Sequence, residues 1–284
     1  MSARYALVSD STADLPVAFI RQHQIYIAPL HVLWGQETLR DGVDISSEEF
    51  FARLQRETVL PTTSQPTPAE FAALYERAME ETGAEGILVL TISADLSGTY
   101  SSAIQAAKEA SFPVRVVDTR TASAAEGLVV AKMAELRDAG MALDEAAELA
   151  QSLTGRTRLI FTLDTLEYLH KGGRIGTAQR LIGTALAIKP VLHVPDGTIH
   201  PRESVRTRKR AVTRLVEIFE EVADLDKPMF FASLNSEAED ESAALEAAIL
   251  ERWQPQIETH LNMKVGCTIG VHVGPGAIGY AVLQ

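Results

Sequence analysis

The chain has little of several features that mark common protein classes. Its 284 residues include one cysteine, Cys267, so it forms no internal disulfide and offers no cysteine pair for a metal site. No segment approaches 18 consecutive apolar residues, and Met1–Asp10 lacks the apolar core of a signal peptide. We therefore expect a protein of the cytoplasm without a membrane-spanning helix.

Positive charge is also scarce. The 26 Lys and Arg residues are outnumbered by 38 Asp and Glu residues, which gives a formal net charge of −12. Binding of nucleic acid needs a basic face, so we expect no nucleic-acid partner. The histidines lack the spacing of a ligand set, so we expect no metal and no cofactor. These histidines include His170, His193, His200, His260 and His272.

Short apolar segments alternate with amphipathic helical patterns through the first 155 residues. We expect strands at Tyr5–Val8, Ile25–Trp34, Gly86–Ile92 and Val114–Val117. Strands joined by helices imply right-handed crossovers and a parallel sheet covered on both faces. The fold class is therefore α/β, and residues 1–155 are predicted to form an α/β/α layer domain with a parallel sheet.

After residue 155 the pattern changes. We expect strands at Leu159–Leu163, Pro228–Leu234 and in the tail 266–283, and helices at Leu181–Lys189, Val205–Val222 and Glu237–Trp253. Asp196-Gly197 is a strong hairpin turn signal. Strands connected both by helices and by a hairpin indicate a mixed sheet. Residues 156–284 are therefore predicted to form a second α/β domain.

The stretch Thr91–Ile104 carries polar residues where an expected strand turns into an expected helix. Ser97 and Gly98 stand at this turn. Ligands of open α/β sheets bind at the carboxyl ends of the strands, and the free N–H groups of a helix start attract anions. We therefore interpret this turn as a candidate binding site. A purely structural role for Ser97 as the helix cap is the alternative.

A second polar stretch has three hydroxyl residues in a row. Thr62, Thr63 and Ser64 follow Pro61 and precede a second proline, which predicts a stiff loop. A capping box after the loop predicts a helix that begins at Pro68. A structural turn explains the prolines, but it needs fewer hydroxyl groups than are present.

Two basic segments stand out in this acidic chain. The loop 171–176, KGGRIG, can hold an anion, although a glycine cap followed by a solvated arginine is equally plausible. The second segment contains Arg202, Arg206, Arg208, Lys209, Arg210 and Arg214. Cations are unfavourable at the amino end of a helix. This cluster therefore predicts an acidic or phosphorylated partner.

The residues suggest two kinds of catalysis, and each lacks one part of its motif. Ser97 and His272 with an aspartate could form a hydrolase triad, but the G-x-S-x-G elbow is missing. Asp10 follows a strand as in D-x-D phosphotransferases, but Thr12 stands where the second carboxylate is needed. We expect Asp10 to act as a loop and cap residue, and an esterase or thioesterase that uses Ser97 remains an alternative.

Six motifs together resemble one protein family from end to end. They are VSDSTADLP at 8–16, PTTSQP at 61–66, LSGTY at 96–100, LHKGGRI at 169–175, KPVLHVPDG at 189–197 and HVGPG at 272–276. In content and order they resemble the DegV family of bacterial fatty-acid-binding proteins. The resemblance implies a two-domain α/β fold, the EDD fold, that holds one long-chain fatty acid.

The resemblance also implies which residues bind the ligand. It places the fatty-acid carboxylate at Thr63 and Ser97, with His272 close to the head group. We add their neighbours in the same turns, Thr62, Ser64 and Gly98, as ligand-binding candidates. The tail needs an apolar tunnel, and we expect the segments Leu159–Leu169 and Leu181–Val194 to line it.

Finally, the resemblance implies a carrier that is not itself an enzyme. A separate ATP-binding fatty acid kinase subunit would phosphorylate the bound carboxylate. Arg174, Arg202 and Arg206 match places where that kinase is thought to dock. Transient contact with a membrane is a further expectation. A regulatory module that senses lipid is the remaining alternative.

Overall fold

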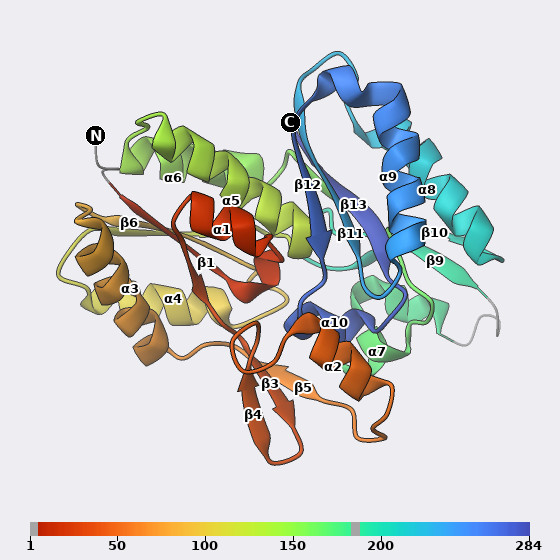
Figure 1. Ribbon diagram of the computed structural model, residues 1–284, viewed down its shortest axis with the longest axis horizontal. Coiled ribbons are helices and arrows are strands. Elements are labelled where there is room, and N and C mark those ends of the chain that lie inside the picture. Colours follow the sequence, from red (N-terminus) through yellow and green to blue (C-terminus); the bar gives the residue numbers. More distant parts are fainter. Residues whose placement is uncertain (1–4, 183–187) are drawn as a thin grey trace.

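Three β-sheets organise the computed structural model, which describes residues 5–182 and 188–284 (Figure 1). The first sheet is parallel, with the order β2-β1-β6-β7. Its strands are β1 (Ala6–Asp10), β2 (Ile25–Ala28), β6 (Ile87–Thr91) and β7 (Val114–Asp118). All residues of β1 and β6 are buried, as is typical of central strands covered on both faces. The parallel sheet predicted for the first half is confirmed.

The second sheet has six strands in the order β10-β9-β8-β13-β11-β12. They are β8 (Thr157–Thr162), β9 (Lys189–His193), β10 (His200–Val205), β11 (Met229–Asn235), β12 (Ile257–Lys264) and β13 (Ile278–Leu283). The β11–β12 pair is parallel and the other pairs are antiparallel, so the predicted mixed sheet is confirmed. The hairpin predicted around Asp196-Gly197 is also present, between β9 and β10.

A small antiparallel sheet in the order β4-β3-β5 corrects two predictions. It consists of β3 (His31–Trp34), β4 (Glu37–Arg40) and β5 (Thr62–Ser64). The segment Ile25–Trp34 is therefore not one strand: it splits into β2 and β3, which join different sheets. Pro29 lies at the break and has no N–H for a ladder. The hydroxyl stretch is not a loop but strand β5.

The helices lie in layers around the two larger sheets (Figure 1). One face of the first sheet contacts α3 (Pro68–Thr82) and α4 (Thr99–Glu109), and the other contacts α5 (Ser123–Asp138) and α6 (Leu143–Leu153). The far face of the second sheet contacts α8 (Arg208–Val222) and α9 (Glu239–Trp253). Helix α5 contacts strands of both sheets and so forms a shared middle layer.

Helix α5 is buried around nearly its whole circumference from Ser123 to Ala131. Such an all-round burial is expected of a helix packed between two layers. At Gly127 an added Cβ would lie 2.5 Å from the Ala13 carbonyl oxygen and 2.9 Å from Cε of Met263, so backbone and side chains approach from opposite halves of the chain. The domain division at residue 155 stays a prediction, and the largest core cluster draws on both sides of it.

The remaining helices are α1 (Val17–Gln22), α2 (Ser47–Leu54), α7 (Glu167–Lys171) and α10 (Cys267–Val273), with short 3-10 turns at Ser11–Ala13, Gly176–Leu181 and Gln254–Gln256. Helix α10 overturns the prediction of strand throughout the tail, since only β13 follows the glycine turn as a strand. Val205, the expected start of a helix, ends β10 instead, and α8 begins at Arg208 after its N-cap residue Thr207. The helix expected at Leu181–Lys189 falls largely on residues 183–187, outside the described residues.

Candidate ligand-binding site

A cavity is lined by residues from both halves of the chain. Its wall includes parts of β5, the loop after β6, the start of α5, β8 and α10. The volume of the cavity is about 80 Å³, several times what one buried water needs. The cavity therefore has room for more than a trapped water molecule.

Most of the cavity wall is apolar. The apolar residues are Leu30, Ile92, Leu96, Ala122, Leu159, Phe161, Leu169, Val194, Ile199, Leu234, Val265, Ile269, Val273 and Ala277. Leu159, Phe161 and Leu169 belong to one of the two segments expected to line a tunnel, and Val194 to the other. The contribution of the first half, from Leu30 to Ala122, was not anticipated.

Polar groups gather where the loop after β6, strand β5 and α10 meet. Oγ1 of Thr63 lies 3.0 Å from Nε2 of His272, although 209 positions separate the two residues. Strand β5 pairs with β3, and α10 contacts both strands, which brings the imidazole to the hydroxyl. Ser64 and Gln65 line the cavity beside Thr63.

His272 is a neutral hydrogen-bonding group near pH 7. Burial, together with the nearby Arg174 cation, lowers the pKa of its imidazole to about 4. Its Nδ1 atom has no hydrogen-bond partner among the described residues. When the single N–H of the neutral ring is on Nε2, it donates to Oγ1 of Thr63, and the Thr63 hydroxyl proton is then free for a ligand acceptor.

Ser97 lies one residue before the cap of α4. The N-cap residue is Gly98, so Ser97 itself is not the cap. The Ser97 hydroxyl nevertheless accepts from the Thr99 N–H at 3.3 Å and lies 2.9 Å from the Thr99 hydroxyl. Because Ser97 also lines the cavity, its hydroxyl links the helix start to the ligand space. A Cβ at position 98 would lie 2.9 Å from the Gln65 amide nitrogen, so glycine permits this approach.

Arg174 lies at the mouth of the cavity. Its Nε donates to the Leu96 carbonyl at 3.2 Å and its Nη1 to the Gly172 carbonyl at 3.0 Å. A surface depression outside the cavity shares Leu96, Ser97, Arg174 and Ile199 with it. The guanidinium thus connects two loops at the point where the ligand space approaches solvent.

The other predicted site residues lie elsewhere. Thr62 is exposed on β5 and does not line the cavity, whereas Thr63 and Ser64 do. Gly98 borders the outer depression and not the cavity. Arg202 and Arg206 are not among the residues that line either space.

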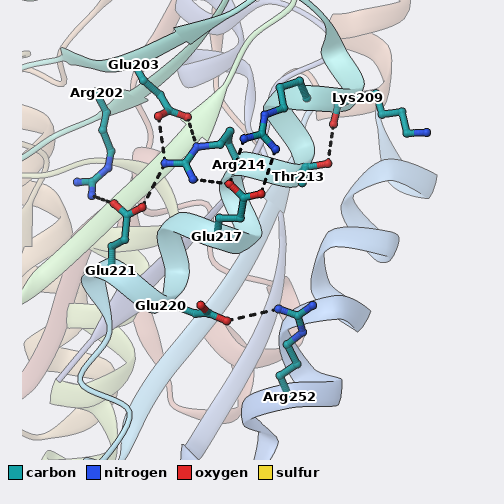
Figure 2. A network of polar contacts seen from close by, with 10 residues as sticks. Arg202, Glu203, Lys209, Thr213, Arg214, Glu217, Glu220, Glu221 and Arg252 are labelled. Carbon is teal, nitrogen blue, oxygen red and sulfur yellow. Dashed lines mark hydrogen bonds and ion pairs between the residues drawn. The ribbon is translucent and has the colours of Figure 1, made fainter.

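The basic cluster is largely neutralised by nearby glutamates, as Figure 2 shows. Arg214 forms ion pairs with Glu203, Glu217 and Glu221. Arg202 pairs with Glu221 at 2.7 Å. The premise that these cations need an outside partner is therefore wrong for most of the cluster.

Two further members of the cluster pair as well, Arg208 with Glu241 and Arg210 with Glu217. Arg206 is exposed and has no ion pair in the described part of the chain.

Several residues at the site were missed from the sequence. Gln65 and Thr268 line the cavity, and Leu234 reaches it from β11. A signal for the α10 face was available: Ile269, His272 and Val273 recur at the i, i+3 and i+4 spacing of one helix face. The glycines around them favoured the strand interpretation.

Buried carboxylates lie behind the cavity wall. Asp10 accepts hydrogen bonds from the N–H groups of Thr12 and Ile92, both at 2.9 Å, so the predicted cap role is confirmed. Burial raises its pKa to about 6.

Within residues 5–182 and 188–284 no three His, Cys, Asp or Glu side chains are grouped so that they could hold a metal ion. The same residues contain no helix that is long and apolar enough to cross a membrane.

The layered fold and its mostly apolar cavity with a polar region define a class of α/β proteins with an internal cavity. A family model described as "Uncharacterised protein, DegV family" matches residues 4–284. The chain belongs to the DegV family.

Known members are similar over nearly the full length. A DegV domain-containing protein of Streptomyces coelicolor is 42% identical over 282 residues, which cover 99% of each chain. A DegV family protein from Thermus thermophilus, described as fatty acid binding, superposes with a TM-score of 0.91 at 36% identity and 99% coverage of both chains.

A stearic acid-binding protein from Eubacterium ventriosum has a TM-score of 0.91 at 26% identity, with 99% of this chain and 98% of that chain covered. The folds of the two solved structures match the α/β architecture described above.

Proposed function

We propose that the protein binds one long-chain fatty acid, with the carboxylate at Thr63 and Ser97 and the tail in the apolar cavity. The observation that carries this proposal is the junction of a mostly apolar cavity with hydroxyl groups at its polar region. Burying about 14 methylenes at roughly 0.8 kcal/mol each gives on the order of 11 kcal/mol. Each hydrogen bond to the carboxylate adds about 1.5–3 kcal/mol. The tail therefore supplies most of the affinity and the head group fixes the orientation.

The polar region suits a carboxylate. A neutral His272 that donates to Thr63 leaves the Thr63 hydroxyl as a donor to the ligand, and the Ser97 hydroxyl lies in the same wall. The Arg174 guanidinium adds a positive charge at the mouth. A carboxylate held by these groups has its charge partly balanced without a metal ion.

We further propose that the protein presents this carboxylate to a separate ATP-binding kinase, which forms the acyl-phosphate. Support comes from the outer depression, which shares Ser97 and Arg174 with the cavity and so adjoins the proposed head-group position. In this role the protein is a carrier and the kinase supplies the catalytic groups. Docking is assigned to Arg174 and to Arg206, which is free of ion pairs among the described residues.

Mass spectrometry of lipid extracted from the purified protein tests the binding proposal. We expect one C14–C18 fatty acid per chain. Thr63→Val and Ser97→Ala should each weaken binding of added palmitate by about tenfold, since each removes one hydrogen bond to a charged group. Thr62→Val is the matched control, because Thr62 is outside the cavity wall. A protein that is empty and also fails to bind palmitate would overturn the proposal.

Phosphorylation of bound palmitate by ATP and a purified kinase subunit tests the carrier role. Arg206→Glu should slow phosphorylation and leave palmitate affinity unchanged. Lys209 is also exposed on the same segment. Lys209→Glu is therefore the control that shows whether any charge reversal there slows phosphorylation. No acyl-phosphate with any kinase subunit would favour the alternative of a lipid-sensing regulatory module.

The esterase alternative is less well supported by the geometry. In a hydrolase the nucleophile is hydrogen-bonded to its base. Here Nε2 of His272 is hydrogen-bonded to Thr63, and the Ser97 hydroxyl is hydrogen-bonded to Thr99. Turnover of a chromogenic acyl ester that disappears in Ser97→Ala would nevertheless establish it.

A further inference from the structure

Thr268 presents an unpaired hydroxyl in the wall of the cavity. The residue is 3% exposed, and its Oγ1 has no hydrogen-bond partner within the described residues. Its backbone N–H is satisfied, because it donates to Oδ2 of Asp41 at 3.0 Å. Burying a hydroxyl without a partner is unfavourable. In a wall that is otherwise mostly apolar, this group needs a partner from the contents of the cavity.

The position of Thr268 relative to the proposed head group follows from helix geometry. Thr268 and His272 both line the cavity from α10 and are four residues apart. Four residues of α-helix rise roughly 6 Å, and side chains at i and i+4 share a face. An extended acyl chain advances roughly 1.3 Å per carbon, given single bonds of about 1.5 Å. An acyl chain that runs along α10 from His272 toward the first turn of the helix therefore brings about its fourth to sixth carbon beside the hydroxyl.

The cavity-lining hydroxyl of Ser123 is also linked to the start of α10, but it is already hydrogen-bonded. Oγ of Ser123 donates to Oδ2 of Asp14 at 2.5 Å, and Oδ1 of Asp14 accepts from the Gly266 N–H at 2.8 Å, next to the first turn of α10. Asp41 occupies the N–H groups of Cys267 and Thr268. Of the two hydroxyls near the start of α10, Thr268 is therefore the one available to a ligand.

We infer that Thr268 is a specificity-determining residue that favours acyl ligands with an oxygen atom, as a hydroxyl or keto group, on about the fourth to sixth carbon. This inference rests on the fatty-acid binding proposed above. An unsubstituted tail would leave the Thr268 hydroxyl unpaired, whereas an oxygen at that depth accepts its proton. The ligand class is thus narrowed from long-chain fatty acids in general to oxygenated ones.

Competition against a fluorescent fatty acid tests the inference. Palmitic acid is compared with its 2-, 4-, 5-, 6- and 10-hydroxy derivatives on the wild type, Thr268→Val, Thr268→Ser and Thr213→Val. The valine variant keeps the shape and removes the hydroxyl, and the serine variant keeps the hydroxyl. Thr213 is exposed on α8 and serves as the matched control.

For each protein, the affinity for the 4-, 5- or 6-hydroxy acid is divided by the affinity for palmitic acid. We expect this ratio to be about fivefold higher in the wild type than in Thr268→Val, because the wild type gains one net hydrogen bond. Thr268→Ser should retain the preference, and Thr213→Val should match the wild type.

Equal ratios in the wild type and Thr268→Val would overturn the inference and show that the hydroxyl serves only a trapped water. A preference for the 10-hydroxy acid would overturn the assigned depth. If none of the proteins binds any acid, the proposed function fails and the inference fails with it.

Discussion

Burial sets the charge state of several side chains around the cavity. It lowers the pKa of His272 to about 4, and it raises the pKa values of Asp14 and Glu126 well above the usual carboxyl range. The directions differ, but the cause is the same, because a poorly solvated site disfavours the charged form of either kind of group. The protein interior beside the proposed ligand therefore favours neutral hydrogen-bonding groups.

The lowered pKa of His272 predicts a pH-dependent stability. The imidazole titrates near 6.5 in the unfolded chain and near 4 in the folded protein, so the unfolded chain binds the extra proton between these values. The free energy of unfolding should fall as the pH drops through this window, by on the order of 3 kcal/mol. In His272→Gln this component is absent. Urea unfolding at pH 4.5 and 7 measures the difference between the two proteins.

His170→Gln is the control for this experiment, because His170 is exposed on α7. If the stability of His272→Gln changes with pH as much as that of the wild type, the neutral assignment of His272 is wrong.

Glu126 gives the opposite pH dependence. Its carboxylate is fully buried and accepts from Thr12 at 2.9 Å and from Ser9 at 3.3 Å. Since its pKa is raised on folding, the free energy of unfolding falls as the pH rises above the usual carboxyl range, by about 1.4 kcal/mol for each unit of difference between folded and unfolded pKa. Glu126→Gln should remove this loss, because the hydroxyl that faces the amide nitrogen can rotate to accept from it while the other hydroxyl still donates to the amide oxygen.

We therefore expect the stability of Glu126→Gln to exceed that of the wild type by more at pH 8 than at pH 5, as measured by urea unfolding. Glu76→Gln, on the exposed face of α3, should show no such trend. An advantage that is the same at both pH values would contradict the argument.

Helix α10 shows how one element depends on a distant part of the chain. Both oxygens of Asp41 accept from its first N–H groups, those of Cys267 and Thr268, at 3.0 Å each. Asp41 lies more than 220 positions earlier in the chain and is 5% exposed. Asp41 therefore accepts the hydrogen bonds of the first turn that a local N-cap residue accepts in most helices. A carboxylate at this end also complements the helix dipole.

Asp41→Ala should therefore destabilise the protein by about 1–3 kcal/mol, because two buried N–H groups lose their acceptor. The first turn of α10 should open, and the buried thiol of Cys267 should react faster with a thiol reagent. Rates of thiol modification and urea unfolding measure both effects. Asp44→Ala removes only an exposed partner of Arg40 and should leave the thiol rate unchanged. Equal rates in the two variants would refute the capping role.

At the scale of the whole molecule, α5 joins the two sheets into one packed unit. It contacts β6 of the first sheet and β8, β11 and β13 of the second. The Ser93 hydroxyl in the first half also donates to the Gly197 carbonyl in the second at 2.8 Å. Unfolding of either half would expose the α5 face that the other half covers, so we expect the halves to unfold together.

The two tryptophans report on this cooperativity. Trp34 is buried in β3 of the first half, and Trp253 in α9 of the second, stacked on Phe219. Trp34→Phe and Trp253→Phe each leave a single tryptophan, whose fluorescence can be excited selectively. Each urea transition followed by fluorescence should coincide with the transition that circular dichroism records for the same variant. A Trp34 transition that precedes loss of the helical signal would show that the halves unfold separately.

The sequence alone determined the elements whose signals are local. The capping boxes at Ser46 and at Thr67 define the starts of α2 and α3, because each joins groups within three residues. Continuous apolar runs predicted the buried strands β1 and β6, and Asp196-Gly197 predicted the hairpin. The same signals predicted the α/β fold class and the mixture of parallel and antiparallel strands in the second sheet.

Tertiary structure decided what depends on partners far away in the chain. The segment Ile25–Trp34 forms two strands because its two ends pair with strands of different sheets. The tail forms α10 because Asp41 caps the first turn of this helix and β5 packs against it. The pairing of Thr63 with His272, and the neutralisation of Arg202 and Arg214 by glutamates, follow from packing. A single sequence shows which groups are present, and the fold determines which of them meet and which remain free to bind a ligand.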